Sequence, residues 1–297
     1  MKPFAIIALL LVPVYGLAQG TSTGEASLKF LYPARILSMG GAPIADTQNA
    51  SASFANPACL ATGRLIQVSF SQMQWIQDIQ TQLLTASMPL SVGTAAIALS
   101  STNVADIPIR EVPGPALGSF TSHSTTIQLG YALNLTSDID VGATAKYLYD
   151  KMYIDDASGY GLDVGVLYRG PIDGLSMAAA ITNVGKMNAF RSQSTDLPTD
   201  VDIGADYTFS TGDFLFAGAL ALGQETGAGG TSEIRVGGEA TYNDLLSVRV
   251  GYQTGYDVRG VSVGLGIHYS FVQLDYAYIP FSEGFGDANV ITIGVNF

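Results

Sequence analysis

Side chains that could do acid–base or nucleophilic chemistry are few in this 297-residue chain, which has two histidines and one cysteine. His123 lies between Ser122 and Ser124. His268 lies near the end of one alternating segment, and Asp275 lies on the next one. Either imidazole is therefore a candidate general base. Neither histidine belongs to a Gly-x-Ser-x-Gly, Walker or His-Glu-x-x-His pattern. The single Cys59 excludes an intramolecular disulfide and a cysteine-cluster metal site. The sequence therefore predicts no enzyme, no metal site and no cofactor.

A second set of reactive groups consists of charged side chains on the polar faces of alternating segments. These residues are Lys146, Asp163, Asp206, Arg235, Glu239, Arg249, His268 and Asp275. If the opposite faces meet lipid, all of them point into a lumen, where Lys146 can pair with Asp163 and Glu239 with Arg249 across neighbouring strands. Two interpretations stay open: a salt-bridge network that makes the barrel rigid, and a ladder of charges that binds a substrate.

Alternating apolar and polar residues dominate the chain from about residue 65. In the segment 139–149, Ile139, Val141 and Ala143 share one face while Asp140 and Gly142 share the other, which is typical of a strand. We predict fourteen strands, near residues 65–75, 79–88, 92–100, 123–133, 139–149, 159–168, 174–183, 200–209, 213–222, 233–242, 245–254, 259–269, 271–278 and 288–297. Most have about ten residues, the length that a tilted strand needs to cross a membrane.

The connections alternate between short turns and longer stretches at 101–122, 184–199, 223–232 and 279–287, as in outer-membrane barrels. Tyrosine and phenylalanine recur near the ends of the apolar faces, where a barrel has its aromatic belts. The polar faces are rich in Gly, Ser and Thr rather than in Lys and Glu, which disfavours a soluble sandwich. The predicted fold is therefore all-β: a fourteen-stranded antiparallel transmembrane β-barrel, multi-pass in the bacterial outer membrane and surrounded by its lipid.

Composition and the first residues agree with an exported membrane protein. Only 13% of the residues are charged, against about 25% in an ordinary soluble domain. The net charge of -12 disfavours nucleic-acid binding, which needs clustered Lys and Arg. Residues 1–18 have the basic start, apolar centre and small-residue cleavage site of a signal peptide. We expect this signal peptide to be followed by a plug at 19–64 and by the barrel at 65–297.

The segment before the first strand is short of strand-forming residues and is expected to fold inside the lumen. Gly40 and Gly41 permit a sharp turn, and Asn56 with Pro57 starts another. This plug either fills space or acts as a gate that moves when a ligand or cargo binds, and these four residues are the candidates for that role.

Apolar residues also occur in the long connection 101–122, which is expected on the external side. Ile107, Ile109, Leu117 and Phe120 would cover something if they face water. They either cap the mouth of the barrel or bind a partner protein or a lipid-like ligand.

Two N-terminal blocks, Pro33-Ala34-Arg35-Ile36-Leu37-Ser38-Met39-Gly40-Gly41-Ala42 and Ala50-Ser51-Ala52-Ser53-Phe54-Ala55-Asn56-Pro57-Ala58-Cys59-Leu60, carry a family resemblance. Together with later pieces such as Leu246-Ser247-Val248-Arg249-Val250-Gly251-Tyr252, they resemble the PorV/PorQ family of outer-membrane proteins, relatives of the FadL fatty-acid transporters. That resemblance implies a fourteen-stranded barrel with a plug, and work with secreted cargo or other export-machinery proteins in type IX secretion.

Three functions follow from these patterns. The resemblance favours a non-enzymatic barrel for protein export and surface attachment. A FadL-like transporter of hydrophobic small molecules is the alternative, and it needs an apolar region inside the lumen. A plain porin would instead show steady ion conductance.

Overall fold

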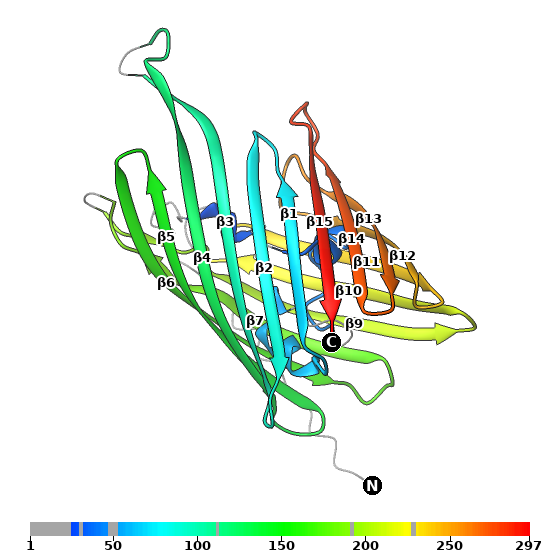
Figure 1. The fold of residues 1–297 in the computed structure, drawn as a ribbon. Coiled ribbons are helices and arrows are strands. Elements are labelled where there is room, and N and C mark those ends of the chain that lie inside the picture. Colours follow the sequence, from blue (N-terminus) through cyan, green and yellow to red (C-terminus); the bar gives the residue numbers. More distant parts are fainter. Residues whose placement is uncertain (1–24, 30–31, 47–52, 111–112, 191–192, 227–229) are drawn as a thin grey trace.

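The protein is described by a computed structural model that covers all residues except 1–24, 30–31, 47–52, 111–112, 191–192 and 227–229. The expected signal peptide lies outside the described residues. Within them, one antiparallel sheet closes on itself around short helices (Figure 1).

The barrel wall is formed by strands that follow one another in chain order. They are β1 (Gln67–Gln74), β2 (Ile79–Pro89), β3 (Thr94–Ile109), β4 (Gly118–Asn134), β5 (Ile139–Met152), β6 (Asp155–Arg169), β7 (Leu175–Met187), β8 (Thr195–Asp196), β9 (Asp200–Thr211), β10 (Phe214–Glu225), β11 (Ser232–Tyr242), β12 (Leu246–Gln253), β13 (Val261–Tyr269), β14 (Val272–Pro280) and β15 (Asp287–Asn296). The two-residue β8 lies beside the end of β7, and β1 pairs with β15. Fourteen long strands thus form a closed ring, and the predicted barrel is confirmed.

Because the sheet is closed, the backbone N–H and C=O groups of the wall form their hydrogen bonds between strands inside the lipid. Successive side chains point to opposite faces, which places the apolar ones on the outer face. On β13, for example, Val263 and Leu265 are exposed, whereas Ser262, on the opposite face, is buried. Short turns join the strands at the end where β1 begins and β15 ends (Figure 1), which is the periplasmic end in barrels of this type. The opposite end is the external end.

The N-terminal segment lies inside the ring (Figure 1). It contains two 3-10 helices, η1 (Ala26–Lys29) and η3 (Pro57–Thr62), and one α-helix, α1 (Ala34–Ser38). None of the helices in the described part of the chain is long and apolar enough to span a bilayer. We call the described residues 25–29, 32–46 and 53–63 the plug.

The long connections are shorter than predicted, because the strands continue through them. The expected loop 101–122 is wrong in most of its length: β3 runs to Ile109 and β4 starts at Gly118. Likewise, β7 runs to Met187, β10 to Glu225 and β14 to Pro280. In the β3–β4 stretch, Ser, Thr and Asn residues pair along the ladder, which contains one bulge.

Candidate functional site in the barrel lumen

The plug touches the wall on two opposite sides of the lumen. Helix α1 packs against β12, β13, β14 and β15, and η3 packs against β3, β4, β5 and β6. Gly40 and Gly41 follow α1, and Asn56 and Pro57 begin η3, so the structure places all four gate candidates where the plug contacts the wall.

Gly40 and Gly41 form the turn after α1. Their φ angles of +68° and +73° lie in the left-handed region that favours glycine. The Gly40 amide donates to the Ser262 hydroxyl at 3.0 Å. A Cβ on Gly40 would lie 2.9 Å from the Tyr252 nitrogen, and one on Gly251 would lie 2.1 Å from the Gly40 nitrogen. Because the residue at each of these two positions is glycine, the plug backbone contacts the wall backbone directly.

Asn56 and Pro57 begin η3 on the other side. The Asn56 side chain accepts a hydrogen bond from the Ala58 amide at 3.0 Å, and its amide donates to the Val166 carbonyl at 3.2 Å. A Cβ on Gly165 would lie 1.9 Å from Asn56 Oδ1, so the wall has no room for a side chain there. This side chain thus caps the helix and ties the plug to β6 at once.

A chain of buried charges joins the plug to the wall. Arg35 of α1 binds Asp46 of the plug and donates to both carboxylate oxygens of Glu239, at 3.1 and 3.0 Å. Glu239 also binds Arg249, as expected from their strands, and Arg249 donates to Asp275 at 2.6 Å. All five side chains are buried. Burial alone disfavours the charge of Arg35, but Asp46 and Glu239 outweigh it and raise the pKa of this guanidinium above its usual value.

Two further ion pairs lie elsewhere in the lumen. Lys146 lies 2.8 Å from Asp163, the expected partner, and donates to Asn183 at 2.6 Å. Asn183 has a φ of +58° at a bulge in β7, and its amide donates to Asp163. Arg235 pairs with Asp202. Lumen charges are thus neutralised locally, which removes most of the cost of burying them.

Two residues of the proposed network lie apart from these pairs. Asp206 accepts a hydrogen bond from the Ala45 amide at 3.4 Å, so it contacts the plug backbone. His268 is exposed at the periplasmic end, opposite Gln273. Asp275 lies opposite Gly266 on the neighbouring strand, and its carboxylate pairs with Arg249 instead of His268.

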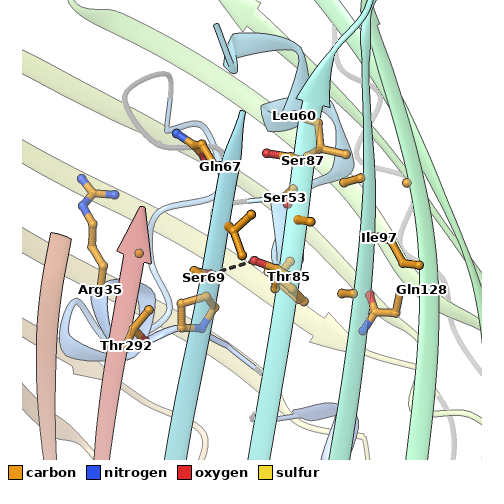
Figure 2. Close-up of a pocket in the computed structure, with 18 of the residues that line it drawn as sticks. Arg35, Ser53, Leu60, Gln67, Ser69, Thr85, Ser87, Ile97, Gln128 and Thr292 are labelled. Atoms are coloured by element: carbon orange, nitrogen blue, oxygen red, sulfur yellow. Dashed lines mark hydrogen bonds between the residues drawn. The ribbon is translucent and has the colours of Figure 1, made fainter. Parts of the chain in front are cut away.

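A cavity of about 70 Å³ lies between the plug and strands β14, β15 and β1 to β5 (Figure 2). Apolar residues such as Leu60 and Ile97 line much of it, and hydroxyl and amide groups line the rest: Ser53, Gln67, Ser69, Thr85, Ser87, Gln128, Thr144, Gln273, Thr292 and Asn296. Figure 2 shows the Ser69 and Thr85 hydroxyls facing each other, 2.7 Å apart. A space of this size and polarity holds a few water molecules.

Toward the external end, the lumen is apolar instead. Seven buried residues form what we call the lumen cluster: Leu28, Leu83, Ala98, Leu148, Ala157, Met187 and Leu197. Six of them belong to the wall or to the segment after β8, whereas Leu28 comes from η1, and Phe54 of the plug packs against the group. The plug thus inserts an apolar side chain into an apolar depression of the wall.

The remaining sequence candidates lie on a β-ribbon that projects from the external end (Figure 1). Ile107, Ile109 and Phe120 are strand residues of β3 and β4, and Leu117, at the tip, is 71% exposed. A bulge places two residues of β3, including Asp106 with a φ of +55°, opposite one of β4. Because each one-residue shift reverses the faces, Ile107 lies opposite Phe120 on the lumen side of the ribbon instead of the lipid side.

The groups considered for catalysis are poorly placed for it. His123 is exposed and hydrogen-bonded to Asn103. Cys59 is buried in the plug, where burial, followed by the charge of Asp46, raises the pKa of its thiol. The described residues contain no group of three or more His, Cys, Asp or Glu side chains that could hold a metal ion.

Sequence reasoning missed three residues of the lumen, one of which, Arg35, joins the plug to the wall. Arg35 is the only charged residue between positions 33 and 45, and that isolation in a small, apolar stretch was the signal. Leu148 interrupts a face otherwise formed by Asp140, Thr144 and Lys146, which pointed to an apolar place in the lumen. Asp202 carried no distinguishing signal.

Solved structures match this barrel closely in shape. No protein-family model and no curated protein matches the sequence. The toluene transporter TodX of Pseudomonas putida matches with a TM-score of 0.61 at 11% identity, over 90% of this chain and 98% of that one. The chain shares the FadL-type fold. The monoaromatic hydrocarbon channel CymD matches at 0.60 and 12%, over 89% and 96%, and a Pseudomonas aeruginosa FadL homologue at 0.58 and 10%, over 90% and 98%.

These comparisons establish the fold of the chain, a closed antiparallel outer-membrane β-barrel. At identities of 10 to 12%, the likeness concerns the fold, and the ligand of this chain depends on the side chains of its own lumen.

Proposed function

We propose that this barrel takes up small hydrophobic molecules from the external side, as a non-enzymatic transporter of the FadL type. The observation that carries the proposal is the lumen cluster. Large apolar side chains that face a water-filled lumen are costly, since each buried Leu is worth about 1.5–3 kcal/mol. Here Leu83, Leu148 and Leu197 are at most 1% exposed, because Leu28 and Phe54 of the plug cover them.

The plug side chains therefore occupy a place that an apolar solute of similar size can take. Toward the periplasmic half lies the cavity between plug and wall, where hydroxyl and amide groups such as those of Ser69, Thr85 and Gln128 alternate with apolar lining. The neighbours named for toluene and for monoaromatic hydrocarbons support the choice of a small aromatic hydrocarbon as the first ligand to test.

The test measures toluene bound to lipid nanodiscs with and without the barrel, by headspace gas chromatography. Leu148→Asn keeps the side-chain size but places an amide in the lumen cluster, so we expect binding to fall about tenfold or more. Leu117→Asn is the matched control, because it makes the same change at the exposed tip of the ribbon. Equal binding by all three proteins, or none above the empty nanodisc, contradicts the proposal.

A second candidate is the binding of secreted cargo or export-machinery proteins, as in the PorV/PorQ family. The ribbon supports it, because Leu117, Ile154 and Tyr153 expose apolar surface beyond the membrane and Phe120 packs on the Tyr153 ring at 5.4 Å. Such a partner should be captured from membranes of the native host by the wild type and by Leu148→Asn, and lost with Leu117→Asn. The two variants thus have opposite effects under the two functions.

A further inference from the structure

The plug begins with an unusual contact between two acids at the external end. Glu25 precedes η1 with a φ of +54°, and its carboxylate accepts hydrogen bonds from Ser27 and, at 2.7 Å, from Ser124 of β4. Asp150 of β5 lies directly opposite Ser124 in the ladder. Its carboxyl is a hydrogen-bonding neighbour of Glu25, and its Oδ1 is buried without a hydrogen-bond partner.

Two carboxylates in contact repel each other unless one of them keeps a proton or a cation lies between them. In the described residues, neither Glu25 nor Asp150 forms an ion pair with a basic side chain. Ser124 is a hydrogen-bonding neighbour of both carboxyls, but it offers a single hydroxyl hydrogen, which lies toward Glu25. A proton on one carboxyl gives the pair the donor that it lacks.

Other charged groups near the pair are engaged elsewhere or turned away. Lys29, at the far end of η1, lies 2.7 Å from Glu225 of β10. His123 and Lys151 alternate with the lumen-facing Ser124 and Asp150, so they point outward, and both are exposed. On β6, the residue opposite Asp150 is Ala157, and Asp155 and Asp156 lie nearer the hairpin end.

We propose that Glu25 and Asp150 share one proton, and that this proton holds η1 in place over the lumen cluster. Asp150 is fixed by ladders on both sides, whereas Glu25 belongs to a four-residue 3-10 helix and its flank. Loss of the proton therefore moves Glu25, and Leu28 leaves the cluster with it. That this movement admits a ligand rests on the proposed function, but the protonation of the pair does not.

The direction of the pH dependence follows from proton counting. The docked pair binds one proton at a pH where two separated carboxyls bind none, so docking is favoured by acid and weakened by base. Each pH unit above the point of release lowers the docked-to-undocked ratio about tenfold.

Hydrogen–deuterium exchange of the purified barrel in nanodiscs tests the proposal without any ligand. Peptides that contain residues 25–29 are followed from about pH 5 to about pH 9, with and without EDTA and with correction for the intrinsic exchange rate. We expect protection of the Leu28 amide, which donates to the Glu25 carbonyl at 3.1 Å, to fall about tenfold per pH unit over the upper part of this range. Protection in α1, which Arg35 fastens, should stay constant.

Variants separate the shared proton from other titrations. Glu25→Gln keeps a hydrogen-bond donor beside Asp150 and removes one charge, so its protection should be independent of pH. His123→Gln and Asp156→Asn remove nearby titratable groups outside the pair and should behave as the wild type. A wild-type profile without pH dependence, a Glu25→Gln profile that keeps it, or a dependence that appears only in EDTA overturns the proposal, the last because it assigns the contact to a metal ion.

Discussion

Replacing Arg35 by methionine is the most direct test of how the plug is held. The substitution keeps an apolar stem of similar length and removes the guanidinium that links Asp46 to Glu239. Glu239 keeps its contact with Arg249, and Arg249 keeps Asp275, so the charges of the wall stay paired. The substitution should therefore weaken the docking of the plug and leave the barrel wall intact.

The size of the effect follows from burial. Removing one partner from a buried ion pair costs about 3–5 kcal/mol, because the remaining charge loses its compensation in a low dielectric. Arg35 is only 5% exposed, so screening by solvent is slight. At about 1.4 kcal/mol per factor of ten, the undocked plug should gain between about a hundredfold and three-thousandfold in population.

Planar-bilayer recordings measure this population, since a displaced plug lets ions through the polar lumen. We expect rare openings in the wild type and frequent openings in Arg35→Met. The matched control is Arg169→Met, because its pair with Asp140 is partly exposed and touches the wall only. Identical open probabilities in wild type and Arg35→Met, with the control also unchanged, would refute the reasoning that this charge chain fastens the plug.

Three further outcomes are expected. Gly165→Ala should raise hydrogen–deuterium exchange in 57–62, because its Cβ would lie 1.9 Å from a side-chain oxygen of the plug, whereas Gly218→Ala, which meets nothing within 4 Å, should leave exchange unchanged. Lys146→Met should destabilise the barrel to urea by about 3–5 kcal/mol, and most of that loss should return in Lys146→Met with Asp163→Leu. Val250→Arg puts a charge on the lipid face and should cost about 2–4 kcal/mol in folding into vesicles if it lies at mid-membrane.

The strand pattern was readable from the sequence because lipid imposes strict alternation on the outer face. Val263 and Leu265 had to face one way, and closure of the ring then fixed the partners of most strands. Beyond the apolar band this constraint ends. The outer halves of β3 and β4 contain Ser, Thr and Asn on both faces, so no period marked them as strands.

The lumen was predictable only where neighbours in sequence are also neighbours in space. Glu239 and Arg249 lie on consecutive strands and directly oppose each other, so their pair followed from the hairpin. Arg35 reaches Glu239 across 204 residues, and no local pattern encodes such a contact. For a related reason the sequence did not show that Arg249, and not His268, pairs with Asp275, since facing inward does not tell how far along the barrel axis a side chain reaches.

The position of α1 has a consequence for how the molecule is assembled. Most of its packing is against the last four strands: the Ala34 amide donates to Thr292 of β15, 258 residues away, and Gly40, just after the helix, donates to Ser262 of β13. This N-terminal helix therefore finds its seat only after nearly all of the chain has been made, and the same strand β15 completes the seam with β1. Contacts of such long range are slow to form. Seating of α1 thus depends on the same late strands that close the wall.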